Sequence, residues 1–166
     1  MRRLVSALAL AALVGACDTG APGTTPPISP GTGGAPREVN LIARDYEFIP
    51  AVVELAPGET ILLHVINGGL VIHEAIVGDA EVQDAWEAAE AAAAGAPPGP
   101  TPVVTVPAGL EGLRVVVRSG ERVDVRWTVP ADPAVVGRLI IGCHIPGHWA
   151  LGMRAGVRAV GGAGPP

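Results

Sequence analysis

Residues 142–153 read GCHIPGHWALGM and connect two apolar, strand-like runs of the chain. The segment places a thiol, an imidazole and a thioether at Cys143, His148 and Met153, with the spacing Cys-x4-His-x4-Met. A short loop between two strands holds its side chains together at one end of a sheet. The segment therefore predicts a group of metal ligands at the end of a β-structure.

The donor types in this loop indicate which metal the group would take. Two imidazoles and a thiolate with a weak axial Met form the ligand set of a blue-copper centre. The loop supplies three of these four ligands, so the second imidazole must come from a distant strand. His73 is the candidate, because it lies in a β-rich run that follows the Asn67-Gly68-Gly69 turn. Soft sulfur donors and imidazoles together suit a one-electron Cu(I)/Cu(II) couple.

Each of these residues also has a structural interpretation. Cys143 could form a disulfide with Cys17 or remain a buried, inert thiol. Met153 could fill space in a core, although it is the only methionine besides the initiator. His144 follows Cys143 directly, so an extended backbone would point its ring away from a metal bound there. His64 lies inside a strand-like run, and we expect it to be a packed or surface residue.

The chain from residue 37 onward is expected to form an all-β domain with seven to eight short strands. Strand-like runs separated by turn signals are typical of a sandwich or barrel. One segment differs: residues 80–94 (AEVQDAWEAAEAAAA) contain no Gly or Pro and predict a helical insertion. This insertion contains no basic residue, and we expect it to be solvated and packed over one sheet edge. A docking surface for a basic partner is the alternative. The strand-like runs are 39–43, 51–55, 60–66, 70–77, 103–106, 113–118, 122–129, 135–141 and 153–160.

The N-terminal region predicts export. Residues 1–17 contain two arginines, an apolar run of signal-peptide length and small residues before Cys17, which together resemble a bacterial lipobox. We therefore expect lipidation of Cys17, and an ordinary secretory signal is the alternative. Residues 18–36 are rich in Pro, Gly and Thr and are expected to form a tether. The domain would then span residues 37–160, followed by a flexible tail at 161–166, in the periplasm or at the cell surface.

Composition narrows the class of partner and the type of core. The formal net charge is −5, and the chain has no lysine and no basic run, which argues against nucleic acid as a partner. Hydrophobic residues make up 49% of the chain and aromatic residues only 3%. A core built from Val, Ile and Leu favours a sheet structure.

The order of several motifs across residues 38–160 resembles the cupredoxin family, which includes plastocyanin, azurin and sulfocyanin. This order is more specific than any single motif. The resemblance implies a Greek-key β-sandwich with one copper ion bound by His73, Cys143, His148 and Met153. The motifs are Phe48-x-Pro50, Ala56-Pro57-Gly58-Glu59, Val65-x-Asn67, His73-Glu74 and the loop from Cys143 to Met153.

The resemblance also implies roles for residues near the ligands. Asn67 is expected to tie the ligand strand to the Cys143 loop. Glu74 is expected to accept a hydrogen bond that orients a ligand or the loop, with a plain surface acid as the alternative. The loop also resembles that of multicopper oxidases, but Gly142 stands where those enzymes have His, so no trinuclear centre is expected.

The resulting functional prediction is a monomeric electron-transfer protein rather than an enzyme. Redox proteins would dock transiently at the mostly apolar loop around His148, and a lipid on Cys17 would hold the protein at the membrane. Two alternatives use the same scaffold. One is a copper carrier or storage protein with the same ligands, and the other is a metal-free interaction module.

Overall fold

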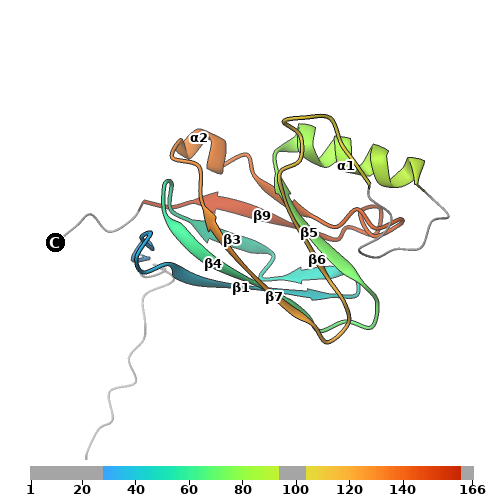
Figure 1. The fold of residues 1–166 in the computed structure, drawn as a ribbon, viewed down its shortest axis with the longest axis horizontal. Helices are drawn as coiled ribbons and strands as arrows, with labels where there is room; N and C mark the ends of the chain where they lie inside the picture. The colour runs from blue at the N-terminus through green and yellow to red at the C-terminus, as the bar shows by residue number, and fades with distance from the viewer. Residues whose placement is uncertain (1–27, 94–103, 162–166) are drawn as a thin grey trace, which may run out of the picture.

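The computed structural model describes residues 28–93 and 104–161, which form a two-layer β-sandwich (Figure 1). The predicted signal segment, Cys17 and residues 162–166 lie outside the described residues. Within the described ranges there are nine strands and two helices. The strands are β1 (Arg37–Arg44), β2 (Glu47–Ile49), β3 (Val52–Leu55), β4 (Thr60–Asn67), β5 (His73–Gly78), β6 (Leu113–Val117), β7 (Arg122–Thr128), β8 (Ile140–Gly142) and β9 (Arg154–Ala159). The helices are α1 (Ala80–Ala92) and α2 (Pro133–Val136).

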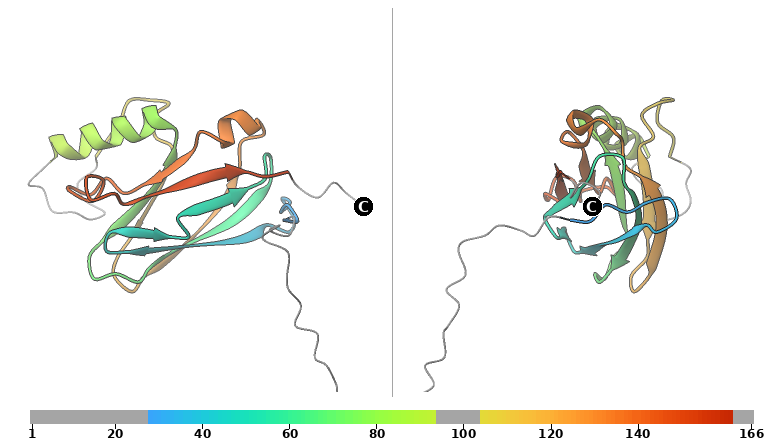
Figure 2. Two further views of the ribbon diagram at one scale, coloured as in Figure 1. Left: turned by 180° about the vertical axis from the view of Figure 1, so that it is seen from behind. Right: turned by 90° about the vertical axis from the view of Figure 1, so that its left-hand side faces the viewer.

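Strands distant in the sequence are neighbours in both sheets. One sheet has the order β2-β1-β4-β7, and the other has the order β3-β9-β8-β5-β6. Two pairs, β1 with β4 and β3 with β9, are parallel, and the remaining pairs are antiparallel. The loop between β8 and β9 lies at the end of the sandwich opposite the one from which the C-terminus leaves (Figure 2). The predicted ligand loop therefore occupies one end of the molecule.

The core fills the space between the two sheets through the period-2 alternation of the strands. In β1, Val39, Leu41 and Ala43 are buried, while Glu38 and Asn40 are exposed and Ile42 is half-buried. Such alternation is expected for a sheet with one wet face. The described core contains a single Phe and is built mainly from Val, Leu and Ile, as the composition predicted.

Strand β5 departs from this alternation, because all six of its residues are buried. Its Ala75 and Val77 belong to the main core, whereas Ile76 packs with Val82 and Trp86 of helix α1. Helix α1 thus covers the outer face of the second sheet over β5 and β8, and its Trp86 and Glu90 also contact Arg114 on the edge strand β6. The predicted helix is confirmed, and it extends from the β6 edge over the inner strands.

The run at 135–141, predicted as a strand, divides into helix α2 and the short strand β8. Asp132 caps α2 by accepting a hydrogen bond from the backbone N–H of Ala134 (2.8 Å), and Pro133 is the first helical residue. Asp and Pro at these positions start helices, and this local signal outweighs the β-preference of the two valines.

Two further boundaries differ from the prediction. Residues 104–106 form no strand, because Val104 and Val106 pack beside Ile76 and α1 instead of pairing with a neighbouring strand. Ordered contacts also begin before residue 37. The backbone O of Gly31 accepts a hydrogen bond from Thr60 N (3.0 Å), and Gly31 N donates to the carboxylate of Glu59 (3.2 Å). The end of the predicted tether is therefore attached to the domain.

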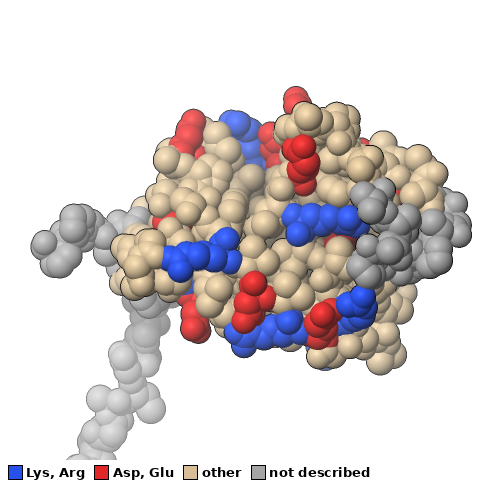
Figure 3. Space-filling model, viewed as in Figure 1, with Lys and Arg blue, Asp and Glu red and all other residues tan. Residues whose placement is uncertain are grey.

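Charged side chains of both signs are interspersed on the face of the molecule in Figure 3, without a large patch of one sign. No helix among the described residues is long and apolar enough to cross a membrane.

Candidate metal centre

Three predicted ligands converge at one end of the sandwich. Nδ1 of His148 lies 3.3 Å from Sγ of Cys143 and 3.3 Å from Nδ1 of His73. The candidate ligand atoms of the three residues all lie within 4.8 Å of one another. His73 opens β5, and the other two residues lie in the loop after β8. These three residues are placed to bind a metal ion.

Met153, the fourth predicted ligand, lies beside these residues in the backbone of the same loop. Its side chain is fully buried, and its backbone N–H donates to the carbonyl of His148 (3.1 Å). The backbone N–H of Cys143 donates to the carbonyl of Met153 (3.1 Å). These two hydrogen bonds close the loop upon itself and keep the thioether residue next to the thiol and the imidazole.

The cluster is shielded from solvent, which disfavours charge on its members. Cys143 and His73 are 0% exposed and His148 is 8% exposed. Burial raises the pKa of the Cys143 thiol to about 12, although backbone hydrogen bonds from Glu74 and Ile145 act in the opposite direction. Burial, and then the neighbouring His73, lowers the pKa of His148 to about 4. The metal-free site therefore holds a neutral thiol and a neutral His148 at pH 7.

The turn between β1 and β2 contacts both imidazoles, which the sequence did not reveal. Oδ1 of Asp45 lies 2.8 Å from Nε2 of His73, and the ring of Tyr46 meets the ring of His148 edge-on at 4.9 Å between centroids. The first contact joins residues 28 positions apart in the sequence, and the second joins residues 102 positions apart. Only the proximity of Asp45-Tyr46 to the Phe48-x-Pro50 motif could have drawn attention to them.

Asn67 has a different role from the expected tie to the Cys143 loop. Its Nδ2 group donates to the carbonyls of Val71 (2.8 Å) and Val117 (3.0 Å), and its Oδ1 accepts from the N–H of Gly69 (2.8 Å). Asn67 thus holds the loop that leads into His73 against strand β6. The expected link to the Cys143 loop is wrong, because the hydrogen bonds of this side chain go to the loop before β5 and to strand β6.

Glu74 does connect a ligand strand to the Cys143 loop. Its carboxylate is fully buried and accepts from the backbone N–H of His144 (3.1 Å) and from Nε of Arg114 (2.7 Å). Arg114 also binds Glu90 (3.1 Å) and lies over the ring of Trp86, 4.5 Å from its centroid. The hydrogen bond that was expected to orient the loop is present, and Glu74 is not a surface acid.

His144 points away from the cluster, as the extended backbone predicted. Its Nδ1 lies 2.9 Å from Glu87 and its Nε2 lies 2.7 Å from Oε1 of Gln83, both on helix α1. Its ring stacks on Trp149 with 4.6 Å between centroids. The inner side of the acidic helix therefore contacts the metal loop, whereas Glu81 and Asp84 on its outer side are exposed, as expected for a solvated insertion.

His64 is a structural residue. It is buried on the outer face of the first sheet, where its Nδ1 lies 2.7 Å from Oδ1 of Asp124 and 2.7 Å from a guanidinium nitrogen of Arg122. Asp124 is its direct cross-strand neighbour on β7. Of the four histidines in the chain, only His73 and His148 belong to the cluster.

The two-sheet sandwich has the cupredoxin fold, and the His-Cys-His cluster lies at one end of it. Among solved structures, the chain is similar to auracyanin from Roseiflexus castenholzii (TM-score 0.59, 18% identity, covering 76% of this chain and 99% of that one). It is also similar to auracyanin A, a "blue" copper protein from Chloroflexus aurantiacus (TM-score 0.59, 21% identity, covering 76% and 100%). An azurin from Methylomonas sp. strain J gives a TM-score of 0.59 at 16% identity, covering 76% and 99%. No protein-family model and no curated protein matches the chain.

Proposed function

We propose that the chain is a blue-copper electron-transfer protein with one copper site. The observation that carries this proposal is the convergence of a thiol and two imidazoles at a buried position, with the only methionine of the domain buried in the same loop. This donor set fits copper, since two imidazoles, a thiolate and a weak thioether are the type 1 ligands. Copper bound there would supply a one-electron Cu(I)/Cu(II) couple.

The protein would hold these ligands with little freedom to move. His73 is held by Asp45, Cys143 is fixed through backbone hydrogen bonds, and Glu74 binds the loop to its neighbouring strand. Ligands positioned in this way need to move little when the charge of the metal changes. A carrier that uses the same ligands would instead need a site that opens for metal exchange, so the burial of the cluster favours electron transfer.

Transient partners would dock over His148, because apolar side chains surround this end of the molecule. Leu70 is 87% exposed, Leu151 is 64% exposed and Tyr46, in contact with His148, is 41% exposed. Exposed apolar groups of this kind mark interaction sites. A small contact area would suit a brief redox encounter. We propose that the protein is a monomer without enzymatic activity, exported and held at the membrane by a lipid on Cys17.

The visible absorption spectrum of the domain after Cu(II) loading and removal of excess metal tests this function. The expected result is an intense thiolate-to-copper charge-transfer band that is absent in Cys143→Ser and retained in His64→Ala, a control for a buried histidine outside the cluster. A wild-type protein that retains no Cu(II) and shows no band would refute electron transfer. Tight Cu(I) binding in the same protein would then indicate a carrier.

A further inference from the structure

The hydrogen bond between Asp45 and His73 fixes which nitrogen of His73 carries a proton. His73 is fully buried, with Nε2 2.8 Å from Oδ1 of Asp45 and Nδ1 3.3 Å from Nδ1 of His148. An ionised carboxylate can only accept a hydrogen bond, so Nε2 must be the donor. A neutral imidazole has one N–H, and Nδ1 therefore presents its lone pair to the cluster.

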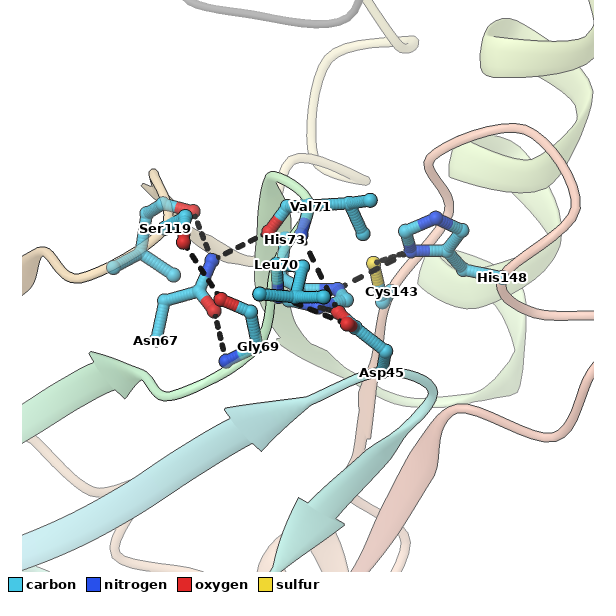
Figure 4. A network of polar contacts seen from close by, with 10 residues as sticks. Asp45, Asn67, Gly69, Leu70, Val71, His73, Ser119, Cys143 and His148 are labelled. Atoms are coloured by element: carbon cyan, nitrogen blue, oxygen red, sulfur yellow. Dashed lines mark hydrogen bonds and ion pairs between the residues drawn. The ribbon is translucent and has the colours of Figure 1, made fainter.

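Asp45 is itself held in place as an anion. Its Oδ2 accepts from the backbone N–H of Leu70 (2.8 Å), and its Oδ1 also accepts from the N–H of Val71 (3.4 Å), as Figure 4 shows. These hydrogen bonds and the contact with His73 keep the Asp45 carboxylate directed at the imidazole.

The loop before β5 provides the space that this pair requires. A Cβ atom on Gly69 would lie 2.3 Å from Oδ1 of Asp45 and 3.0 Å from Nε2 of His73, so a larger residue would displace the pair. Gly69 is held on both sides, because its N–H donates to Asn67 and its carbonyl accepts from the hydroxyl of Ser119 (2.7 Å). Asn67 therefore helps to keep Asp45 and His73 together.

We infer that Asp45 is a positioning residue of the metal centre, which holds the Nε2 proton of His73 and favours Cu(II) over Cu(I) through its negative charge. A carboxylate behind a metal-bound histidine fixes its tautomer and raises its basicity. A negative charge near the metal also stabilises the ion of higher charge. The effect on copper rests on the proposed function, whereas the effect on the tautomer concerns the metal-free protein alone.

The tautomer is tested by two-bond proton–nitrogen NMR of the metal-free protein. His73 is expected to carry its proton on Nε2 in the wild type and to become a mixture of tautomers in Asp45→Asn, whose amide can donate or accept. The wild-type spectrum decides this point even if the variant does not fold. A wild-type His73 protonated on Nδ1 would overturn the assignment, whether or not the protein binds copper.

The charge effect is tested by measuring Cu(II) and Cu(I) affinities separately in competition with chelators. Asp45→Asn should lower the ratio of Cu(II) to Cu(I) affinity about tenfold. About tenfold is the lower end of the change in metal affinity that follows when a residue supporting a metal ligand is replaced. This change corresponds to a one-electron potential about 59 mV higher. Gly69→Ala, which displaces the pair but keeps the charge in the chain, should change the ratio in the same direction by a smaller factor.

Asp124→Asn is the matched control, because Asp124 forms the same kind of contact with buried His64 (2.7 Å), which is outside the cluster. Its affinity ratio should stay within about twofold of the wild type. Equal ratios for wild type and Asp45→Asn, or equal changes in the Asp45 and Asp124 variants, would overturn the charge effect. Failure of the wild type to bind copper would refute the proposed function but leave the NMR result on Asp45 intact.

Discussion

Replacing Glu74 with Gln removes a fully buried negative charge that joins strand β5 to the metal loop. The carboxylate accepts from the backbone N–H of His144 (3.1 Å) and from Nε of Arg114 (2.7 Å). Gln has one acceptor and one donor at the same two positions. If its oxygen faces His144, its NH2 group faces the guanidinium, and one hydrogen bond is lost to a donor–donor contact.

The size of the loss follows from the remaining partners of Arg114. Removing one member of a buried ion pair costs about 3–5 kcal/mol when the other charge is left unpaired. Here the guanidinium keeps Glu90 (3.1 Å) and the ring of Trp86, and its side chain is 25% exposed. The expected loss of unfolding free energy is therefore about 1.5–3 kcal/mol, the value of a hydrogen bond to a charged group.

Urea unfolding of the metal-free protein at pH 7 measures this cost. Glu54→Gln is the control, because Glu54 pairs with Arg158, whose side chain is 61% exposed, and an exposed pair is worth about 0–1 kcal/mol. Glu74→Gln should therefore lower the unfolding free energy well below that of Glu54→Gln. Equal stabilities for the two variants would refute the interpretation of Glu74 as a buried structural charge.

Three further predictions concern the ligands and the surface above them. Cu(II) binding at pH 7 should release about one proton from Cys143, since its thiol has a pKa of about 12. Calorimetry in buffers of different ionisation enthalpy measures this proton release, which should be absent in Cys143→Ser. The metal-free protein should lose about 2 kcal/mol of stability, after a discount for solvent screening, as the pH falls from 6.5 to 4. In that window the unfolded chain binds a proton that folded His148 excludes, so urea unfolding of His148→Gln should lack this part of the loss. Leu151→Glu should slow electron self-exchange between two copies of the protein by at least about tenfold, because the added charges of the facing copies repel each other. NMR line broadening measures this rate. Val52→Glu is the control, because Val52 is exposed outside the loop, and it should leave the rate unchanged.

The fold was largely predictable because its strands carry local signals. Strand-like runs bounded by turn signals located β1, β4 and β7 to within two residues. The loop spacing Cys-x4-His-x4-Met likewise indicated a ligand cluster, and the three residues that the structure tests do converge. These features depend on residues close together in the sequence.

The contacts that support the ligands could not be predicted, because they join distant segments through tertiary packing. Asp45 reaches His73 from a turn 28 positions earlier, and Gln83 reaches His144 across 61 positions. Neither Asp45 nor Gln83 belongs to a periodic pattern or a motif. The acidic composition of residues 80–94 did not reveal these contacts, since a count of charges cannot show that Glu87 contacts His144 or that Glu90 is buried.

The helical insertion is better understood as a second wall of the metal site than as a separate module. Gln83 donates to the carbonyls of Ile76 (3.1 Å) and Ile140 (3.0 Å), one on each of two neighbouring strands, while its oxygen faces His144. One buried side chain therefore joins α1 to β5, β8 and the residue after Cys143. Because Asp45 contacts His73 and Gln83 contacts His144, polar side chains support the ligand residues on two sides, and the surface near His148 carries exposed apolar side chains for a partner.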